Sequence, residues 1–206
     1  MAHIYTMDIY TSQEFVDLDA ATVRNLELVE TMRDKSKRGS LFWVLDNTKT
    51  SMGTRMLKQW ILRPLVNAAS VNNRLSGVEE LVSAMDIRDD LSDALTGVND
   101  IERLMSRVSV GTANARDMAS LCVSFARLPF LHKILCRTRS TILSVQAANL
   151  DTLEDLRDLL ERAINPEPPI TLREGNIIRD GFLEEIDRLR HNTTRSLYER
   201  NDVIVI

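Results

Sequence analysis

Apolar residues recur through this sequence with the period of an α-helix, and few breakers interrupt them. The 206 residues contain only seven glycines and five prolines, so the turn residues that a many-stranded sheet needs are scarce. Amphipathic stretches of this kind bury one face against neighbouring helices. We therefore predict an all-α fold, an irregular multi-helix domain with at most a minor short β element near residues 170–179.

Local signals place the first helices. Asp19 is a suitable N-cap for a helix continuing as far as Met32, although a strand over residues 23–29 is an alternative. Ser40 precedes a short apolar helix over residues 41–45. Thr50 or Ser51 then caps a helix that stops before a proline.

Further helices follow along the chain. They are expected over residues 71–85, near residues 91–95, and over residues 101–108, 118–125, 130–136 and 153–164. Asn114 and Asp151 are the expected caps of two of them. The first of them carries Leu75, Val78, Leu81 and Val82 on one face, which we expect to be packed.

The last part of the sequence changes character. Three prolines at 166, 168 and 169 end the preceding helix. Gly175 and Asn176 between short apolar pairs then indicate a two-stranded hairpin or an extended turn. A thin, charged helix starts near Gly181 and is expected to project. The domain organisation predicted is a lead-in over residues 1–18, a helical core over 19–180 and a projecting helix over 181–206.

The charge balance bears on nucleic-acid binding. The 26 basic and 30 acidic residues give a formal net charge of -4 and are interleaved. Because phosphate neutralisation supplies most of the affinity for DNA, strong autonomous DNA binding is not expected. The basic run Arg33, Lys35, Lys37 and Arg38 is interpreted as a solvated loop, with a phosphate contact as the alternative.

No motif for catalysis or for cofactor binding is found. Phosphate-binding loops are missing, and the three histidines are too far apart in sequence to suggest a metal site. An acidic group, Asp89, Asp90 and Asp93, would suit a metal-dependent enzyme acting on diphosphates, but a solvated acidic face is the preferred interpretation. We therefore predict no catalytic, cofactor or metal residues.

The same sequence gives no sign of export or of a membrane anchor. No signal peptide is evident, and no apolar run approaches the length of a membrane span. Cys122 and Cys136 are interpreted as reduced packing thiols. A cytoplasmic location is expected.

One helix junction is the candidate structural site. Its residues are Asp46, Thr50, Met52, Gly53, Arg55, Trp60 and Pro64. In this interpretation Asp46 ends one helix, Arg55 pairs within the turn, and Trp60, like Trp43, packs in the core. A glycine early in a helix costs about 1 kcal/mol relative to alanine, so Gly53 suggests close backbone packing.

Several segments carry a resemblance to a known family. They are Leu18–Leu28 (LDAATVRNLEL), Gly39–Arg55 (GSLFWVLDNTKTSMGTR) continuing to Trp60 and Arg63-Pro64-Leu65, Arg74 with Val78–Leu81 (VEEL), Asp100–Leu104 (DIERL), and Gly175–Phe182 (GNIIRDGF) with Glu185–Asp187 (EID). In order and spacing they resemble the core, or lever, domain of the MutS family of DNA mismatch-repair ATPases. The resemblance covers residues 1–195 and is closest to the bacterial mismatch-repair branch.

The resemblance implies a mechanical role. In the family, this domain joins a DNA-gripping clamp to the ATPase domain, so the segment is expected to couple the two without activity of its own. ATP and Mg would be cofactors of the full-length protein, not of this segment. Mismatched double-stranded DNA, a homodimer partner and a MutL-type protein would be its partners. The alternative is a stand-alone helical module for protein–protein interaction.

Overall fold

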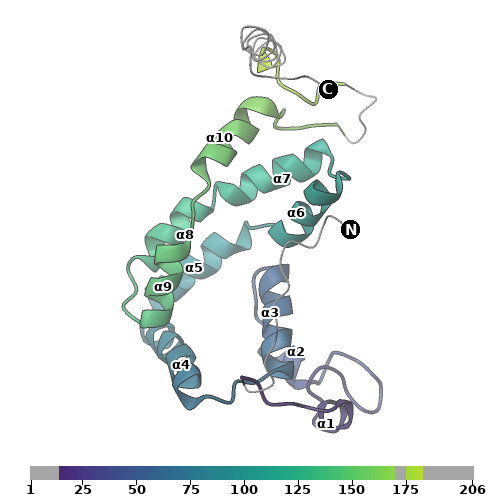
Figure 1. The fold of residues 1–206 in the computed structure, drawn as a ribbon, viewed down its shortest axis with the longest axis vertical. Coiled ribbons are helices and arrows are strands. Elements are labelled where there is room, and N and C mark those ends of the chain that lie inside the picture. Colours follow the sequence, from purple (N-terminus) through teal and green to yellow (C-terminus); the bar gives the residue numbers. More distant parts are fainter. Residues whose placement is uncertain (1–13, 170–174, 183–206) are drawn as a thin grey trace, which may run out of the picture.

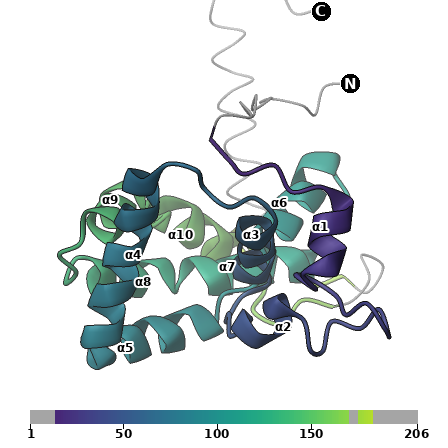
Figure 2. The same ribbon diagram turned by 90° about the horizontal axis from the view of Figure 1, so that it is seen from below.

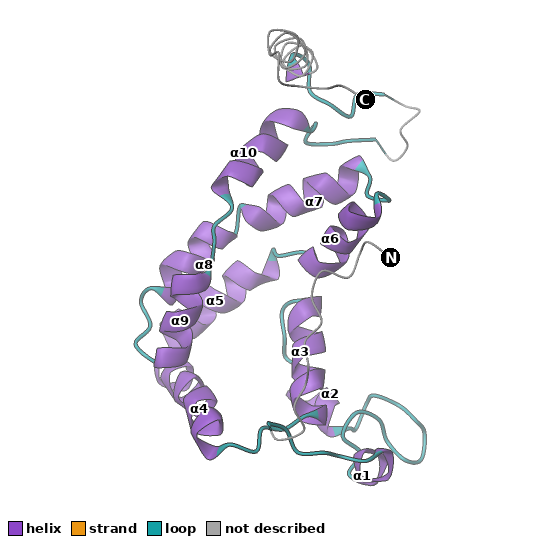
Figure 3. Cartoon of the chain, in the orientation of Figure 1, coloured by secondary structure: helices purple, strands orange, loops and turns teal. Residues whose placement is uncertain are grey.

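The fold is a set of short helices joined by tight turns, given by a computed structural model that describes residues 14–169 and 175–182. The helices in these residues are α1 (Ala20–Asn25), α2 (Leu41–Leu45), α3 (Ser51–Leu62), α4 (Ala68–Ser83), α5 (Met85–Thr96), α6 (Ile101–Val110), α7 (Ala115–Phe125), α8 (Leu128–Leu135), α9 (Thr141–Asn149) and α10 (Glu154–Ala163). The described residues contain no β-strand, as Figure 3 shows, which agrees with the all-α prediction.

One hydrophobic core holds the larger part of the molecule together. Helices α5, α6, α7 and α8 contribute its buried residues, which are Ala94, Leu104, Leu121, Phe125, Leu128 and Leu131. Partly buried side chains from α10, including Leu160, pack against them. Helix α9 lies against α4 and α8. We refer to α4–α10 as the body of the molecule.

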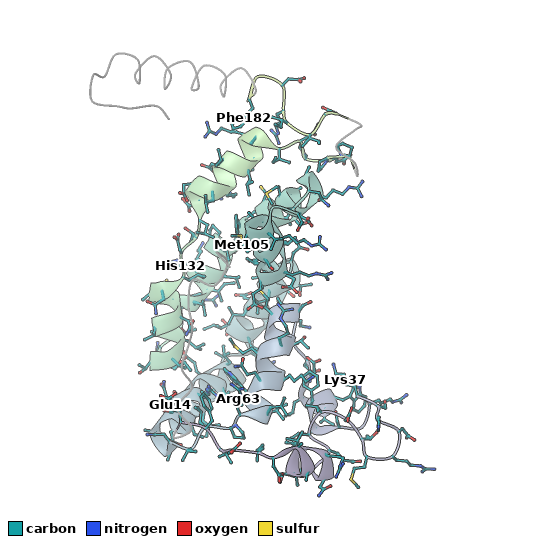
Figure 4. The ribbon with its side chains drawn as sticks, turned by 45° about the vertical axis from the view of Figure 1, so that its right-hand side comes forward. Glu14, Lys37, Arg63, Met105, His132 and Phe182 are labelled. Carbon is teal, nitrogen blue, oxygen red and sulfur yellow. The ribbon has the colours of Figure 1, made fainter. Side chains whose placement is uncertain are left out.

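The first three helices lie outside that core. Figure 1 shows α3 standing apart from α4 and α5, with α2 at its base and α1 beyond it, and Figure 2 shows the same separation from below. Helix α3 packs closely on α2. Residues 14–16 run extended beside the connection to α4, where Val16 N–H donates to the Pro64 carbonyl (2.8 Å) and Val66 N–H to that of Glu14 (3.1 Å). Figure 4 shows Glu14 near Arg63, the residue that ends α3.

Helix starts follow the caps expected from the sequence. Asp19, Ser40, Thr50 and Asn114 each accept a hydrogen bond from a backbone N–H in the first turn of the helix that follows. Asn114 and Asp117 form a reciprocal capping box. These caps were predictable because each depends on residues no more than three positions apart.

The first helix is shorter than the sequence predicts. Helix α1 ends at Asn25 instead of continuing to Met32, and the alternative strand over 23–29 is also wrong. The cause is the left-handed backbone of Glu27, whose φ is 48°. The chain turns back there, so that Leu41 N–H donates to the Glu27 carbonyl (3.1 Å) and closes the loop of residues 26–40.

The middle of the chain differs from the prediction at three helices, one of which, α5, begins at Met85 instead of near residue 91. Helix α4 starts at Ala68 rather than residue 71, because Asn67 accepts hydrogen bonds from the N–H groups of Ala69 and Ser70. Helix α9, Thr141–Asn149, was not predicted. Its sequence TILSVQAAN has no amphipathic face and no side-chain cap, so periodicity gave no signal.

The last described segments also differ. Asp151 was the predicted N-cap of α10, but Leu153, with a φ of 49°, takes that position. The Asp151 carboxylate instead accepts a hydrogen bond from Leu153 N–H. Ile178 forms an isolated antiparallel bridge with Ile164. Residues 170–174 of the predicted hairpin, residues 1–13 of the lead-in and residues 183–206 of the projecting helix lie outside the described residues.

Three further expectations are corrected by the structure, two by side-chain exposure and one by the length of an apolar stretch. Trp43 and Trp60 are exposed by 47% and 42%, so neither is a core residue in this chain. Cys122 is half-buried, but Cys136 is exposed rather than packed. The stretch Ala115–Leu135 is long and apolar enough to cross a membrane, contrary to the expectation of no such run. It is apolar because α7 and α8 supply much of the core.

Candidate functional site

The turn between α2 and α3 is fixed by a small polar network. Asp46, which ends α2, accepts hydrogen bonds from Lys37 Nζ and Thr48 Oγ1, both at 2.6 Å. These two donors hold the pKa of Asp46 below its ordinary value. Thr48 Oγ1 also lies 2.6 Å from Thr54 Oγ1 in the first turn of α3. The network ties the end of α2 to the first turn of α3.

Thr50 and Gly53 start α3. Gly53 N–H donates to Thr50 Oγ1 at 3.0 Å, which makes Thr50 the cap and excludes Ser51. A Cβ at residue 53 would lie 3.2 Å from Thr50 Oγ1 and 3.5 Å from Thr48 Cβ. The neighbours of Gly53 are thus side-chain atoms of its own turn, and the close backbone packing suggested by the sequence stays a prediction.

Arg55 connects α3 to the body. Its Nη1 and Nη2 donate to the two carboxylate oxygens of Asp100, at 2.7 Å each. Nη2 and Nε also donate to one oxygen of Glu102, at 2.6 and 3.2 Å. The sequence interpretation, in which Arg55 pairs within its own turn, is therefore wrong. We call Arg55, Asp100 and Glu102 the ionic fork.

Electrostatics follow from this geometry. Two parallel N–H···O bonds match the planar guanidinium to a carboxylate and are among the stronger charge-assisted pairs. Arg55 accordingly lowers the pKa of Asp100, and the two carboxylates raise the pKa of Arg55. About half of the Arg55 side chain (49%) and most of Glu102 (68%) remain exposed, against 20% of Asp100. Water and salt therefore reach the fork.

Asp100 is held in place from the other side by the body. It is the N-cap of α6 and accepts a hydrogen bond from Arg103 N–H at 3.2 Å. The preceding residue, Asn99, donates its backbone N–H to the fully buried Ser124 Oγ on α7, at 3.0 Å. Asp100 therefore presents its carboxylate to α3 from a position anchored in the core.

A second contact links α3 to α4. The guanidinium of Arg74 lies 3.9 Å from the ring centroid of Trp60, within the range of a cation–π interaction. Of the remaining candidate residues, Met52 is half-buried in the first turn of α3, and Pro64 follows the end of that helix. The fork and this cation–π pair therefore connect α3 to the body, and no α3 side chain belongs to the buried core cluster formed by α5–α8.

The partners of Arg55 and Trp60 were missed at the sequence level. Asp100, Glu102 and Arg74 lie between 14 and 47 residues away from the groups they contact. They belong to segments that carry the family resemblance, yet no spacing rule pairs them. Only an alignment of relatives that showed covariation could have done so.

Of the acidic group considered for an enzyme, Asp90 is paired with a distant arginine, together with the nearby Asp86. Arg137 Nη2 donates to Asp86 at 2.7 Å and Arg137 Nη1 donates to Asp90. Among the described residues, no group of three His, Cys, Asp or Glu side chains is placed to hold a metal ion. The solvated acidic face stays the preferred interpretation of this group.

The basic loop is exposed and partly neutralised. Lys37 is paired with Asp46 and lies 4.4 Å from the ring centroid of Phe42, beside α2 (Figure 4). Arg33, Lys35 and Arg38 are exposed residues of the loop. The solvated loop predicted from the sequence is therefore present, while a phosphate contact stays a prediction.

A cavity of about 180 Å³ lies between α7, α10 and the segment around Arg179. Its lining includes Cys122, Val123 and Leu160. Burial raises the pKa of Cys122, which keeps the thiol protonated and unreactive near neutral pH. The lining is mostly apolar, with Glu161, Asn165 and Arg179 as its polar members.

Comparison with known proteins gives one consistent result. The model of the family described as MutS domain III matches residues 21–204. Proteins named DNA mismatch repair protein MutS are similar to nearly the whole chain: that of Acetivibrio thermocellus is 43% identical over 190 residues, and that of Clostridium perfringens is 44% identical over 190 residues. Each alignment covers 92% of this chain but only 22% and 21% of the relative, so the chain spans about a fifth of their length.

Proposed function

This chain belongs to the MutS domain III family, and we propose that it is the core segment that couples the DNA clamp to the ATPase domain of a longer mismatch-repair protein. Mechanical coupling needs an element with two discrete arrangements that both sites can bias. We propose that the joint between α3 and the body is this element.

The ionic fork is the observation that carries the proposal. Arg55 reaches across 45 residues of sequence to Asp100 with ideal bidentate geometry, yet it remains half exposed. A buried apolar contact resists separation, because separating it returns apolar surface to water. An exposed ion pair exchanges its partners for water at small cost. The fork therefore suits a contact that forms in one state and opens in another.

The rest of the proposal concerns the longer protein. We propose that this segment has no enzymatic activity and binds no cofactor, and that ATP and Mg act in the ATPase domain. Mismatched double-stranded DNA, a second copy of the longer protein and a MutL-type protein are the proposed partners. The relatives are bacterial DNA repair proteins, so we place the protein in the cytoplasm with the chromosome. Their greater length supports this proposal over a stand-alone interaction module.

Coupling is tested in the longer protein with the fork opened. Arg55→Ala should leave the basal ATPase rate and the affinity for duplex DNA near those of the parent. The change in ATPase rate caused by a G·T mismatched duplex should shrink. Lys58→Ala, an exposed residue of the same helix, is the matched control. An unchanged mismatch response in Arg55→Ala would refute the role of the fork.

The isolated chain gives a complementary test. Fluorescence anisotropy of a labelled duplex, with and without a G·T mismatch, should show weak, salt-sensitive binding with no preference for the mismatch. Tight mismatch-selective binding by these 206 residues would mean that recognition resides here, and the coupling proposal would then be wrong.

A further inference from the structure

A histidine and a cysteine lie side by side at the end of α8. His132 and Cys136 are four residues apart, and Cys136 Sγ lies 3.8 Å from each of the two ring nitrogens of His132. Cys136 is exposed and His132 is half-buried, so solvent reaches both groups. Figure 4 shows His132 at the outer side of the body. We call these two residues the α8 pair.

The sequence interpretation did not consider this pair. It compared the three histidines with one another and treated both cysteines as packing thiols. Cys122 fits that description, since it is half-buried and lines a cavity beside α10, but Cys136 does not. Residues four apart on a helix lie on the same face, one turn apart. The pair could therefore have been found from its spacing alone.

The spacing is that of two ligands of one metal ion. Side chains at i and i+4 of a helix can bind the same ion, as the two histidines of H-E-x-x-H sites do. A tetrahedral zinc ion takes sulfur at about 2.3 Å and imidazole nitrogen at about 2.0 Å, so these ligand atoms lie roughly 3.5 Å apart. The 3.8 Å separation in the α8 pair is close to that value. Rotation about χ2 of His132, a broad torsion, aims one nitrogen lone pair at the ion.

Charges near the pair are mostly compensated. Cys136 is the C-cap of α8, where the partial negative charge of a helix C-terminus favours a cation. The next residue, Arg137, is paired with Asp86 and Asp90 of α5. Lys133 is exposed and adds one positive charge beside the pair. Binding of a soft ion by a thiolate is decided chiefly by ligand type, so this charge does not exclude it.

We propose that the α8 pair is a binding site for a thiophilic divalent ion such as Zn²⁺. The thiol gives up its proton on binding, the neutral imidazole supplies the second ligand, and water fills the remaining positions. Zinc sites that hold their ion firmly use three or four protein ligands, so two ligands predict an exchangeable ion. Mg²⁺ should not compete, because it prefers oxygen ligands. This site is separate from the ionic fork and from the coupling proposed above.

Metal titration of the 206-residue chain tests the site. Cd²⁺ is the optical probe, because a cadmium–thiolate bond has an ultraviolet charge-transfer band, and Zn²⁺ binding is measured by calorimetry with and without excess Mg²⁺. Cys136→Ser and His132→Gln each remove one ligand, and Cys122→Ser is the matched control. The parent and the control should bind one ion per chain. Each ligand variant should bind at least about tenfold more weakly, since even residues that only orient a ligand are worth about 10–100-fold.

The same titrations contain the outcomes that would overturn the proposal. Weak binding in Cys136→Ser but not in His132→Gln would show a single thiol without a second ligand. Weak binding in Cys122→Ser would place the ion in the cavity beside α10. One ion per two chains, together with a dimer in light scattering, would assign the pair to a bridge between copies.

Thiol modification of the unaltered chain gives a test that no folding defect of a variant can mimic. With Zn²⁺ at about ten times its dissociation constant, maleimide should modify Cys136 about tenfold more slowly, because only the metal-free fraction reacts. Cys122, measured separately by mass spectrometry, should be unaffected. Equal rates at Cys136 with and without Zn²⁺ would contradict the site. Neither ATP nor DNA is involved, so the metal site can fail while the coupling proposal stands, and the reverse.

Discussion

Arg55 and Asp100 are joined by two parallel hydrogen bonds of 2.7 Å across 45 residues of sequence. Asp100 is also the N-cap of α6, so the same carboxylate caps one helix and binds an arginine of another. No α3 side chain belongs to the buried core cluster that includes Leu104 of α6, so this pair is a principal link between α3 and the body.

The bidentate geometry predicts that lysine cannot replace arginine at residue 55. Arg55→Lys and Arg55→Ala should both increase amide hydrogen exchange in α3, since an ammonium cannot satisfy the two Asp100 oxygens in parallel. Asp100→Asn should have a similar effect, and the double variant should be no worse than either single one. Exchange in α7 serves as the internal control and should not change. Additive effects in the double variant would show that Arg55 and Asp100 act separately.

Ser124 is predicted to position the fork from within the core. Its Oγ accepts from Asn99 N–H and donates to the Ser120 carbonyl at 2.8 Å. Ser124→Ala should lower the free energy of unfolding by about 0.5–1.5 kcal/mol, because the Asn99 N–H loses its acceptor. Ser120→Ala, which removes a hydroxyl from the same helix, is the control in denaturant unfolding. Equal effects of the two substitutions would contradict this role.

Gly77→Ala should destabilise the contact between α4 and α9. The added Cβ would lie 2.7 Å from Ile142 Cγ2, and overpacking of this kind costs about 1–3 kcal/mol. The better helix propensity of alanine returns up to about 1 kcal/mol, so thermal unfolding should show a net loss. Ile142→Ala should relieve the clash when combined with Gly77→Ala. If the pair is no more stable than the sum of its parts predicts, the clash is not the cause.

Acid should weaken the carboxylate contacts between helices before it unfolds the hydrophobic core. The pKa values of Asp46, Glu80 and Asp100 are all lowered, by Lys37, by Ser140 and by Arg55 respectively. A carboxyl whose pKa is lowered by folding contributes stability above its unfolded value and loses it as the pH falls through its folded value. For Asp100 that loss therefore lies below its ordinary pKa of 3.8. Hydrogen exchange in α3 should be constant from pH 7 to about pH 5 after correction for intrinsic rates, and should rise below about pH 4. In Asp100→Asn that rise should be reduced.

Several helix boundaries, the fold class and the family were determined by the sequence itself, because each depends on neighbouring residues or on a repeating pattern. The starts of α2, α3 and α7 depend on Ser40, Thr50 and Asn114, whose hydroxyl or amide groups reach backbone N–H groups three residues away. The ends of α5 and α6 are equally local, since Gly97 and Gly111 directly follow these helices. The all-α class followed from the period of the apolar residues, and the family followed from long matched segments.

Other features required the tertiary structure, because they depend on residues that are distant in sequence. Helix α9 has no amphipathic pattern and is defined by its neighbours α4 and α8. The period of α4 placed Leu75, Val78 and Val82 on one face, but a period cannot say whether that face has a partner in this chain. In the same way, the charge of Arg55 was plain in the sequence. Its binding to Asp100 was decided only when folding brought α3 to the start of α6.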